Sequence, residues 1–343
     1  MIKEAIQKLV EGKDLMEEEA VEAMNCIMEG EATAAQIGSF ITALRIKGET
    51  VEEITGCAKV MRQKAEKIEP DLPYCIDTCG TGGDGADTFN ISTASALVAA
   101  AGGAAVAKHG NRSVSSKSGS ADVLEALGVY IELTPGQVRN CIEKLGIGFM
   151  FAPGFHKSMK HAAGPRRDLG IRSIFNILGP LTNPAASKGH VLGVFDEKLT
   201  GPLARVLKNL GTHKALVVHG MDGLDEITVT GPTKVSELKD GEIFEYYIHP
   251  EEFGLQRASI DEVKGGNARE NADIITRIFN GEKGPKRDIT VINSAAALYV
   301  GKVVDSLEDG IKLSEEIIDS RKALNKLLEF KEHTNRLAVA QEL

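Results

Sequence analysis

The sequence has few of the features that mark membrane-spanning, disulfide-stabilised or nucleic-acid-binding proteins. No apolar run approaches the roughly 18–20 residues that a membrane-spanning helix needs. The 5 cysteines are odd in number and form no CxxC pair, which argues against a disulfide framework and favours a reducing compartment. The net charge of −9 offers no basic face to a nucleic acid. We therefore expect small-molecule partners, with no nucleic acid and no membrane.

The sequence also lacks the motifs of several common enzyme classes. It contains no GxxxxGK[ST] loop and no GxGxxG spacing, so nucleoside triphosphate hydrolysis and hydride transfer both lose support. No Ser-His-Asp set, zinc-ligand spacing or pair of catalytic acids stands out. The first residues, Met1–Ile6, resemble a charged amphipathic helix rather than a signal peptide. A cytoplasmic protein is the expectation.

Two segments have the composition of anion-binding loops. The segment 108–120 holds several cationic side chains, five serines and no carboxylate, and the segment 80–85 reads Gly-Thr-Gly-Gly-Asp-Gly. Backbone N–H groups of such loops and of helix starts bind phosphates. The alternatives are a tight turn for the glycine loop and a flexible linker for the serine-rich one. Function is favoured because small hydrogen-bonding side chains follow the glycine loop at the mouth of a helix, namely Thr88, Asn90, Ser92 and Thr93.

The hydrophobic pattern divides the chain into a helical part and an α/β part. Helical periodicity extends to about Ile68 and includes a capping box from Thr50 to Glu53, and prolines follow it at 70 and 73. Strands are then predicted at 74–79, 104–107, 147–151, 191–194 and 215–219, with helices between them. We expect a small N-terminal helical domain, residues 1–70 joined by helices from about 156–185, and an α/β catalytic domain over 74–343. Its central sheet should be mainly parallel and flanked by helices, with phosphate sites at the carboxyl ends of strands.

A few isolated residues are ambiguous when they are considered alone. Asp225 and Glu226 could be ordinary surface carboxylates, but in a site with two phosphates they become candidate Mg²⁺ ligands. Adjacent residues on an extended segment point apart, so the two could serve different ions. Arg166 and Arg167 could bind an anion or cover a helix surface, and His156 could contact a ligand or hold structure.

Taken together, the motifs resemble those of the anthranilate phosphoribosyltransferases. The resemblance covers essentially the whole chain in the right order. It is carried by Gly80–Asp84, Asn90–Ser95, Lys108–Arg112, Gly119–Glu125, Ile174–Pro184 and Asp225-Glu226.

The resemblance implies both a fold and an activity. The fold is that of the nucleoside phosphorylase and phosphoribosyltransferase type, usually a homodimer. The activity transfers the phosphoribosyl group of 5-phosphoribosyl 1-diphosphate (PRPP) to the amine of anthranilate, which releases pyrophosphate in a step of tryptophan biosynthesis. The implied cofactor is Mg²⁺, as two ions, with no organic cofactor.

The resemblance also assigns roles to residues by their place in the motifs. Four residues are expected to carry the catalysis, namely Lys108, Arg166, Asp225 and Glu226. The PRPP contacts are expected from Gly80, Gly83, Asp84, Thr88, Asn90, Ile91, Ser92, Thr93, Lys108, His109, Gly110, Asn111, Arg112, Ser113, Val114, Ser115, Ser116 and Ser120. Anthranilate is expected to contact Gly80, Asn111, His156 and Arg166, and Mg²⁺ to be held by Ser92, Asp225 and Glu226.

Two other functions stay open at this point. A pyrimidine nucleoside phosphorylase shares the fold but uses inorganic phosphate and a nucleoside. A nucleic-acid-binding relative of the fold would act through a basic surface, which the net charge of −9 disfavours.

Overall fold

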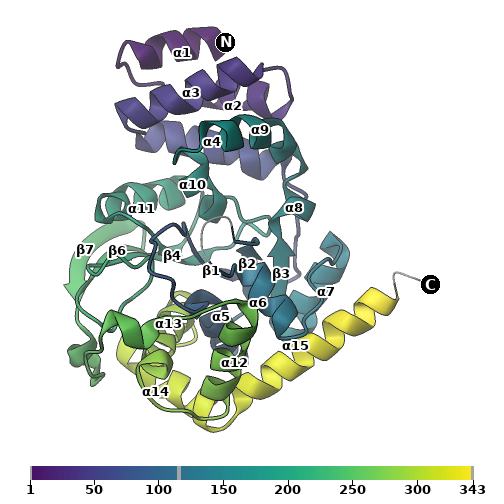
Figure 1. Ribbon diagram of the computed structural model, residues 1–343, viewed down its shortest axis with the longest axis vertical. Coiled ribbons are helices and arrows are strands. Elements are labelled where there is room, and N and C mark those ends of the chain that lie inside the picture. The colour runs from purple at the N-terminus through teal and green to yellow at the C-terminus, as the bar shows by residue number, and fades with distance from the viewer. Residues whose placement is uncertain (1, 114–116, 341–343) are drawn as a thin grey trace.

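The computed structural model describes residues 2–113 and 117–340, which form a helical layer stacked on an α/β layer (Figure 1). Four N-terminal helices build most of the first layer: α1 (Ile2–Val10), α2 (Glu17–Met28), α3 (Ala34–Lys47) and α4 (Val51–Lys64). Two helices from later in the chain join them, because α9 (Lys160–Leu169) packs on α3 and α2 while α10 (Phe175–Leu178) packs on α4. The domain boundaries at 70 and 74 stay a prediction, which this packing favours.

Side-chain caps fix where the N-terminal helices begin. The predicted capping box at the start of α4 is confirmed: the backbone N–H of Thr50 donates to the Glu53 carboxylate at 2.8 Å, and the N–H of Glu53 donates to Thr50 Oγ1 at 3.2 Å. Thr33 and Gln36 form the same box at the start of α3. Each box satisfies two backbone donors that a helix start would otherwise leave unpaired.

A seven-stranded sheet in the order β3-β2-β1-β4-β5-β6-β7 forms the second layer. Five strands are parallel: β1 (Ile76–Gly80), β2 (Val106–Gly110), β3 (Ile147–Phe151), β4 (Gly189–Gly193) and β5 (Lys214–Gly220). The mainly parallel sheet is as predicted, and its five parallel strands all end on one edge, where ligands bind in such folds. None of the described helices combines the length and the apolar character that crossing a bilayer requires.

An antiparallel hairpin at the sheet edge was missing from the sequence prediction. It consists of β6 (Thr233–Lys239) and β7 (Glu242–Ile248). The two turn residues, Asp240 and Gly241, both have positive φ, at 53° and 79°. An Asp-Gly pair between two runs of alternating polar and apolar residues is the usual sequence signal for such a turn. The pair at 240–241 is the signal that predicts this hairpin.

One predicted strand boundary was wrong in a way that matters for the site. The strand expected at 104–107 begins at Val106 and extends to Gly110. Its start is delayed because the N–H of Ala104 still donates to Ala99 at the end of α5 (Ile91–Ala101), after Gly103 turns the chain with a φ of 100°. Lys108 therefore lies inside the strand, opposite Phe149 of β3, rather than at its end.

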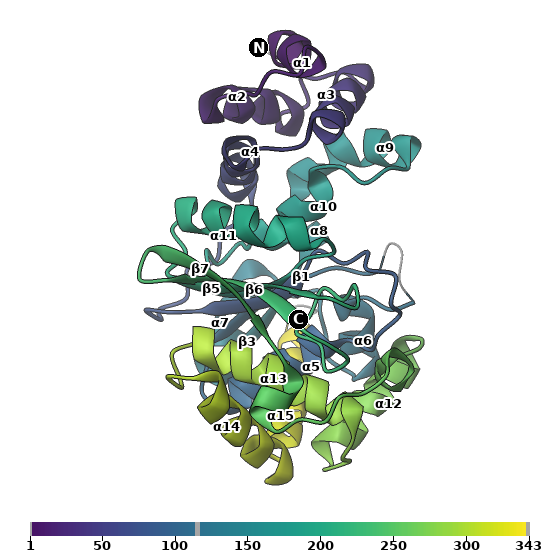
Figure 2. The same cartoon turned by 90° about the vertical axis from the view of Figure 1, so that its left-hand side faces the viewer.

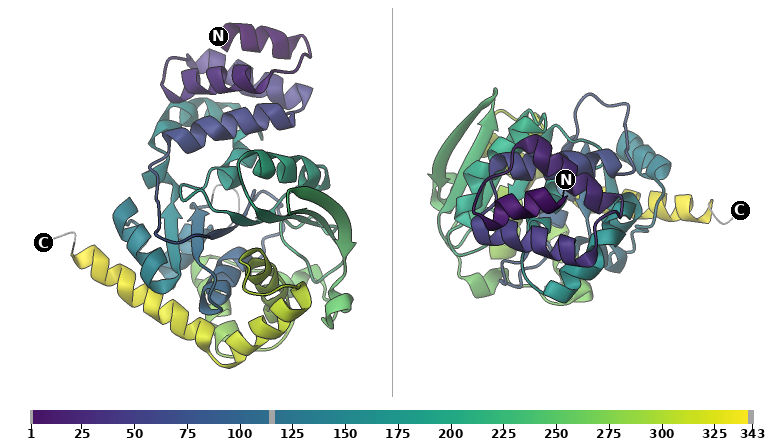
Figure 3. Two further views of the ribbon diagram at one scale, coloured as in Figure 1. Left: turned by 180° about the vertical axis from the view of Figure 1, so that it is seen from behind. Right: turned by 90° about the horizontal axis from the view of Figure 1, so that it is seen from above.

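Helices cover both faces of the sheet (Figure 2). One face packs on α5 and α13 (Pro285–Val300), with α12 (Ala268–Phe279), α14 (Leu307–Asp319) and α15 (Lys322–Val339) behind them. The end of α15 projects from the molecule on the side away from the hairpin (Figure 3). The other face packs on α11 (Thr200–Asn209), against which α4 lies, so that Leu192 and Val217 share one core with the helical layer.

Candidate active site

The centre of the candidate site is where the chain after β5 rests on the ends of β1 and β4. A Cβ atom on Gly80 would lie 2.2 Å from Asp225 Oδ2, and one on Gly193 would lie 1.5 Å from the Asp225 carbonyl oxygen. The N–H of Gly82 donates to Asp225 Oδ2 at 2.7 Å. Glycine is thus required at both strand ends, because only hydrogen leaves room for the Asp225 backbone and carboxylate.

The charges of three acidic side chains interact at this edge, namely those of Asp84, Asp225 and Glu226. Desolvation and the nearby charge of Asp84 raise the pKa of Asp225 to about 7. Burial and the Asp225 charge raise the pKa of Glu226 well above its usual range, although Lys108 and the N–H of Ser92 oppose this. Carboxylates that repel one another are stabilised by a divalent cation, and hard cations prefer oxygen ligands.

These carboxylates fit a Mg²⁺ ion that takes its other ligands from water and from the substrate. Among the described residues, no group of three or more His, Cys, Asp or Glu side chains is close enough to enclose a metal ion. Mg²⁺ usually takes one or two carboxylates and fills its remaining positions with water and substrate phosphates. The arrangement therefore suits an ion that arrives with a polyphosphate substrate.

The N-terminus of α5 faces this acidic edge. Asn90 is the N-cap residue, and its side chain bonds to Ser118 and Asn271. Ile91, Ser92 and Thr93 form the first turn, whose N–H groups attract anions. Thr93 Oγ1 is buried with no hydrogen-bond partner among the described residues. Thr88 pairs with Lys264 in an isolated bridge just before this turn.

The side chain of Lys108, in β2, extends to the N-terminus of α5. Its ammonium group donates to the carbonyl of Thr78 and, at 3.4 Å, to Ser92 Oγ. Burial lowers the pKa of Lys108, while Asp77 and Glu226 raise it. Its positive charge is held beneath the α5 terminus, where it acts on Ser92 and Glu226.

The serine-rich loop begins at the end of β2. Gly110 allows close packing, since a Cβ there would lie 2.2 Å from Ser120 Oγ. Asn111 accepts a hydrogen bond from Ser120 through its carbonyl, at 3.3 Å. Asp122, at the third position of α6 (Ser120–Ala126), accepts from the N–H of Ser113 at 3.0 Å. Arg112 forms ion pairs with Asp122 and Glu125. The predicted contacts at Val114, Ser115 and Ser116 lie outside the described residues.

A pair of buried imidazoles lies beside this loop. The rings of His109 and His156 are 4.9 Å apart between centroids, and Nε2 of each has no partner among the described residues. Burial lowers the pKa of His109 to about 3 and that of His156 to about 4, opposed by hydrogen bonds to the carbonyls of Gly179 and Thr182. Both rings are therefore neutral at pH 7, with one nitrogen free to accept a hydrogen bond.

The two candidate arginines of α9 differ sharply in their surroundings. Arg166 is partly buried, its guanidinium lies 4.9 Å over the ring of Phe175, and burial lowers its pKa. No carboxylate among the described residues pairs with it. The side chain of Arg167 is 83% exposed and lies 3.9 Å from Asp168. Arg166 is thus the arginine with an unsatisfied charge.

Three supporting residues were missing from the sequence prediction. Asp77 in β1 is buried and accepts from the His109 N–H at 3.2 Å and from Asn183 Nδ2 at 2.6 Å. Asn183 also donates to the carbonyl of Ala107 at 2.8 Å. Arg172 stacks over Phe195 and donates to the carbonyl of Gly83 in the glycine loop. Asn183 lies within the quoted motif 174–184, whereas nothing in the sequence distinguishes Asp77 or Arg172.

Known families match both layers of the chain. Residues 3–65 match the helical bundle domain of a glycosyl transferase family, and residues 72–324 match the a/b domain of that family. The anthranilate phosphoribosyltransferase of Acetivibrio thermocellus is 70% identical over 343 residues, which covers 100% of this chain and 99% of that protein. The one from a Thermoanaerobacter species is 58% identical over 337 residues, 98% of this chain and 100% of that protein.

Solved structures give the same result. The anthranilate phosphoribosyltransferase of Thermus thermophilus superposes with a TM-score of 0.92 at 43% identity, covering 96% of this chain and 99% of that one. The Saccharomyces cerevisiae enzyme, solved in complex with PRPP and Mg, has a TM-score of 0.89 at 28% identity and covers 98% of each chain. Because the sequence relatives span the whole chain and the solved structures share both layers, this chain belongs to the anthranilate phosphoribosyltransferase family of glycosyl transferases.

Proposed function

We propose that the chain transfers the phosphoribosyl group of PRPP to the amine of anthranilate, giving N-(5-phosphoribosyl)anthranilate and pyrophosphate, in tryptophan biosynthesis. The observation that carries this assignment is that the chain has both an acidic site and a separate cationic site. An acidic, Mg²⁺-suited edge with a free helix terminus fits a polyphosphate. Arg166 is partly buried and has no carboxylate partner among the described residues, which fits an acceptor that is an acid.

The phosphoribosyl diphosphate would lie across the strand ends. Its contacts would come from the glycine loop, the first turn of α5 and the loop after β2. The residues in these roles are Gly80, Gly83, Asp84, Thr88, Asn90, Ile91, Ser92, Thr93, Lys108, His109, Gly110, Asn111, Arg112, Ser113, Val114, Ser115, Ser116 and Ser120. Arg112 would have to leave Glu125 to reach a phosphate, whereas the α5 N–H groups are already available.

Two Mg²⁺ ions would be held by Ser92, Asp225 and Glu226, with Asp84 alongside. When bound, they neutralise the negative charge that develops on the departing pyrophosphate. The yeast relative was solved with Mg bound. In this chain, the Lys108 ammonium donates to the Ser92 hydroxyl, and its charge acts on the Glu226 carboxylate.

Anthranilate would be bound by Arg166, Gly80, Asn111 and His156. The yeast relative was solved with 4-fluoroanthranilate. Arg166 would hold the carboxylate and so turn a bimolecular attack into a positioned one. The free Nε2 of His156 can accept an amine N–H. An aryl amine attacks without prior deprotonation, so no general base is needed before the C1–O bond of the ribose breaks.

The assembly we propose is a homodimer in the cytoplasm. The helical layer carries three exposed apolar side chains that a second copy would cover, Val10, Met16 and Ile46. Ile46 is 82% exposed, so a second copy that covered it would remove apolar surface from water.

The test of the function is the loss of anthranilate fluorescence on mixing with PRPP and Mg²⁺. We expect turnover with anthranilate and none with uracil or nicotinate as acceptor. Phosphate-dependent release of uracil from uridine would instead support a nucleoside phosphorylase, and a salt-sensitive gel shift would support a nucleic-acid-binding protein.

A further inference from the structure

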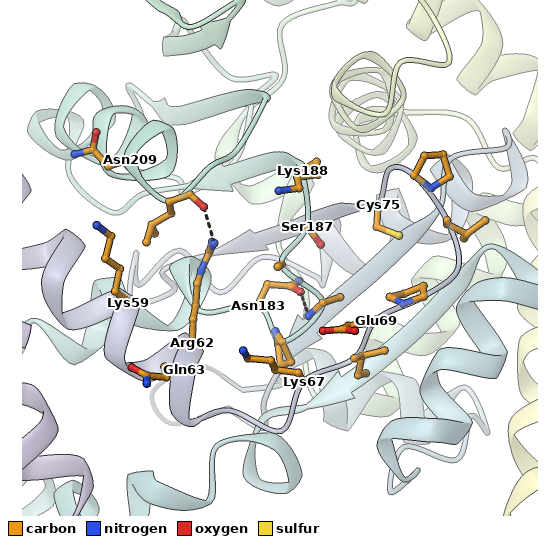
Figure 4. Close-up of a pocket in the computed structure, with 18 residues that line it drawn as sticks. Lys59, Arg62, Gln63, Lys67, Glu69, Cys75, Asn183, Ser187, Lys188 and Asn209 are labelled. Carbon is orange, nitrogen blue, oxygen red and sulfur yellow. Dashed lines mark hydrogen bonds between the residues drawn. The ribbon is translucent and has the colours of Figure 1, made fainter.

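A cavity in the described part of the chain lies away from the candidate active site. Its volume is about 570 Å³, and Figure 4 shows the residues that line it. Cys75, Lys188 and Leu210 line it where the chain approaches β1, β4 and β5, so it opens at the amino ends of these strands. The length of a five-residue strand, roughly 15 Å, separates it from the carboxylate edge.

The cavity is lined by more positive than negative charge. Lys59, Arg62, Lys67 and Lys188 line it, against the single carboxylate of Glu69. Lys59 is paired with Glu17 outside the cavity. The remaining cations have no carboxylate within salt-bridge distance among the described residues, and Lys188 reaches only the carbonyl of Gly211, at 3.5 Å.

Arg62 is held in place with one nitrogen unused. Its Nε donates to the carbonyl of Leu181 at 2.6 Å and its Nη1 to the carbonyl of Leu210 at 3.1 Å. Nη2 is buried and has no hydrogen-bond partner among the described residues, and the same is true of Oγ of Ser187, which lines the same cavity. A buried cation without a counter-ion is costly, and so is a buried hydroxyl without a hydrogen bond, unless a ligand satisfies them.

Prolines form part of the remaining wall, beside polar side chains such as Gln63 and Asn209. Pro70, Pro73 and Pro184 line the cavity, and they leave room for the body of a small molecule behind its charged group. We propose that the cavity is a second binding site of this protein, for a small organic oxyanion whose charged group contacts Arg62 and Ser187.

The segment that forms one wall also reaches the acceptor side of the candidate active site. Pro184 and Ser187 line the cavity, while the carbonyls of Gly179 and Thr182 hold the rings of His109 and His156. An oxyanion in the cavity would therefore contact a segment that supports the proposed anthranilate pocket.

Calorimetric titration of the whole protein with inorganic phosphate, and separately with acetate, tests the proposal. Ser187→Ala removes a hydroxyl that no described residue pairs with, so the fold should not suffer. We expect it to weaken binding of at least one of the two anions about tenfold, because hydrogen bonds to charged groups are the stronger kind. The wild type and Ser187→Ala share the sites at the strand ends, so a difference between their titrations reports on the cavity alone. The anion whose binding is weakened shows whether the charged group of the natural ligand is a phosphate or a carboxylate.

Ser314→Ala is the matched control, because Ser314 Oγ is also buried and unpartnered within the described part of the chain, but Ser314 does not line the cavity. It should bind both anions as the wild type does. Titrations that are the same for the wild type and Ser187→Ala with both anions would overturn the proposal. So would an equal loss in Ser314→Ala.

Discussion

Arg166 is the residue at which the acceptor assignment can be tested most directly. Its guanidinium is partly buried over Phe175 and has no carboxylate partner among the described residues. Arg166→Gln keeps much of the side-chain volume but removes the charge. We expect the KM for anthranilate to rise about 10- to 100-fold, which corresponds to the loss of a charge-assisted hydrogen bond. The KM for PRPP should change little.

The neighbouring arginine supplies the control for this measurement. Arg167 is on the same helix, and its side chain is 83% exposed. Steady-state kinetics of Arg167→Gln should match the wild type. An unchanged anthranilate KM in Arg166→Gln would remove Arg166 from the proposed site.

The raised pKa of Asp225 makes the free energy of unfolding depend on pH. The pKa is about 7 in the folded protein and 3.8 ordinarily. Between about pH 4 and pH 7, the folded state keeps a proton that the unfolded chain has lost, so the free energy of unfolding falls as pH rises. One unit of pKa shift corresponds to about 1.4 kcal/mol. Because Asp225 is partly exposed, we expect the free energy of unfolding to fall by about 2 kcal/mol over this pH range.

Asp225→Asn removes this titration and isolates its effect. Without Mg²⁺, the Tm of Asp225→Asn should exceed that of the wild type by about 2–4 °C at about pH 8, with a much smaller difference at about pH 4. Thermal unfolding at a series of pH values measures it. A difference in Tm that stays constant with pH would contradict the assignment of the raised pKa to Asp225. Turnover should be nearly lost in the same variant.

At the scale of the elements, the packing of strand ends against the loop after β5 determines where the carboxylates lie. Gly193 ends β4, and a Cβ there would lie 1.5 Å from the Asp225 carbonyl oxygen. Gly193→Ala must therefore displace the Asp225 segment. We expect kcat to fall about 100-fold, the usual effect of a misplacement of about 1 Å. Gly136→Ala, in α7 (Pro135–Leu145), is the control. No described atom lies within 4 Å of a Cβ built on Gly136, so the activity of this variant should be unchanged.

The elements of the site could largely be predicted from the sequence, while several of its contacts could not. Glycine loops and small polar residues before a helix have local signatures, so the segments around Gly80 and Ser92 were found without a structure. The pairing of Asp77 with Asn183 joins residues 106 positions apart, and the sequence gives no sign of it. The burial of Lys108 was missed because it depends on where β2 begins, and strand limits depend on tertiary packing.

At the scale of the whole molecule, the layered arrangement predicts that activity does not depend on association. The proposed phosphate loops, the carboxylates and Arg166 all belong to one chain, whereas the exposed apolar side chains of the helical layer lie outside this set. We expect sedimentation analysis to give a mass of twice 36.7 kDa for the wild type. Ile46→Glu places a charge in the proposed interface and should shift the protein to a monomer, because burying an unpaired charge is costly.

The same variant separates association from catalysis. Its kcat should stay within about twofold of the wild type if the site is complete in one chain. Glu22→Gln in α2 changes a charge on the same layer at a position without an exposed apolar side chain, and it should remain a dimer. A wild-type protein that sediments as a monomer would exclude the proposed homodimer. An Ile46→Glu monomer that has lost its activity would mean that the second chain supports the site.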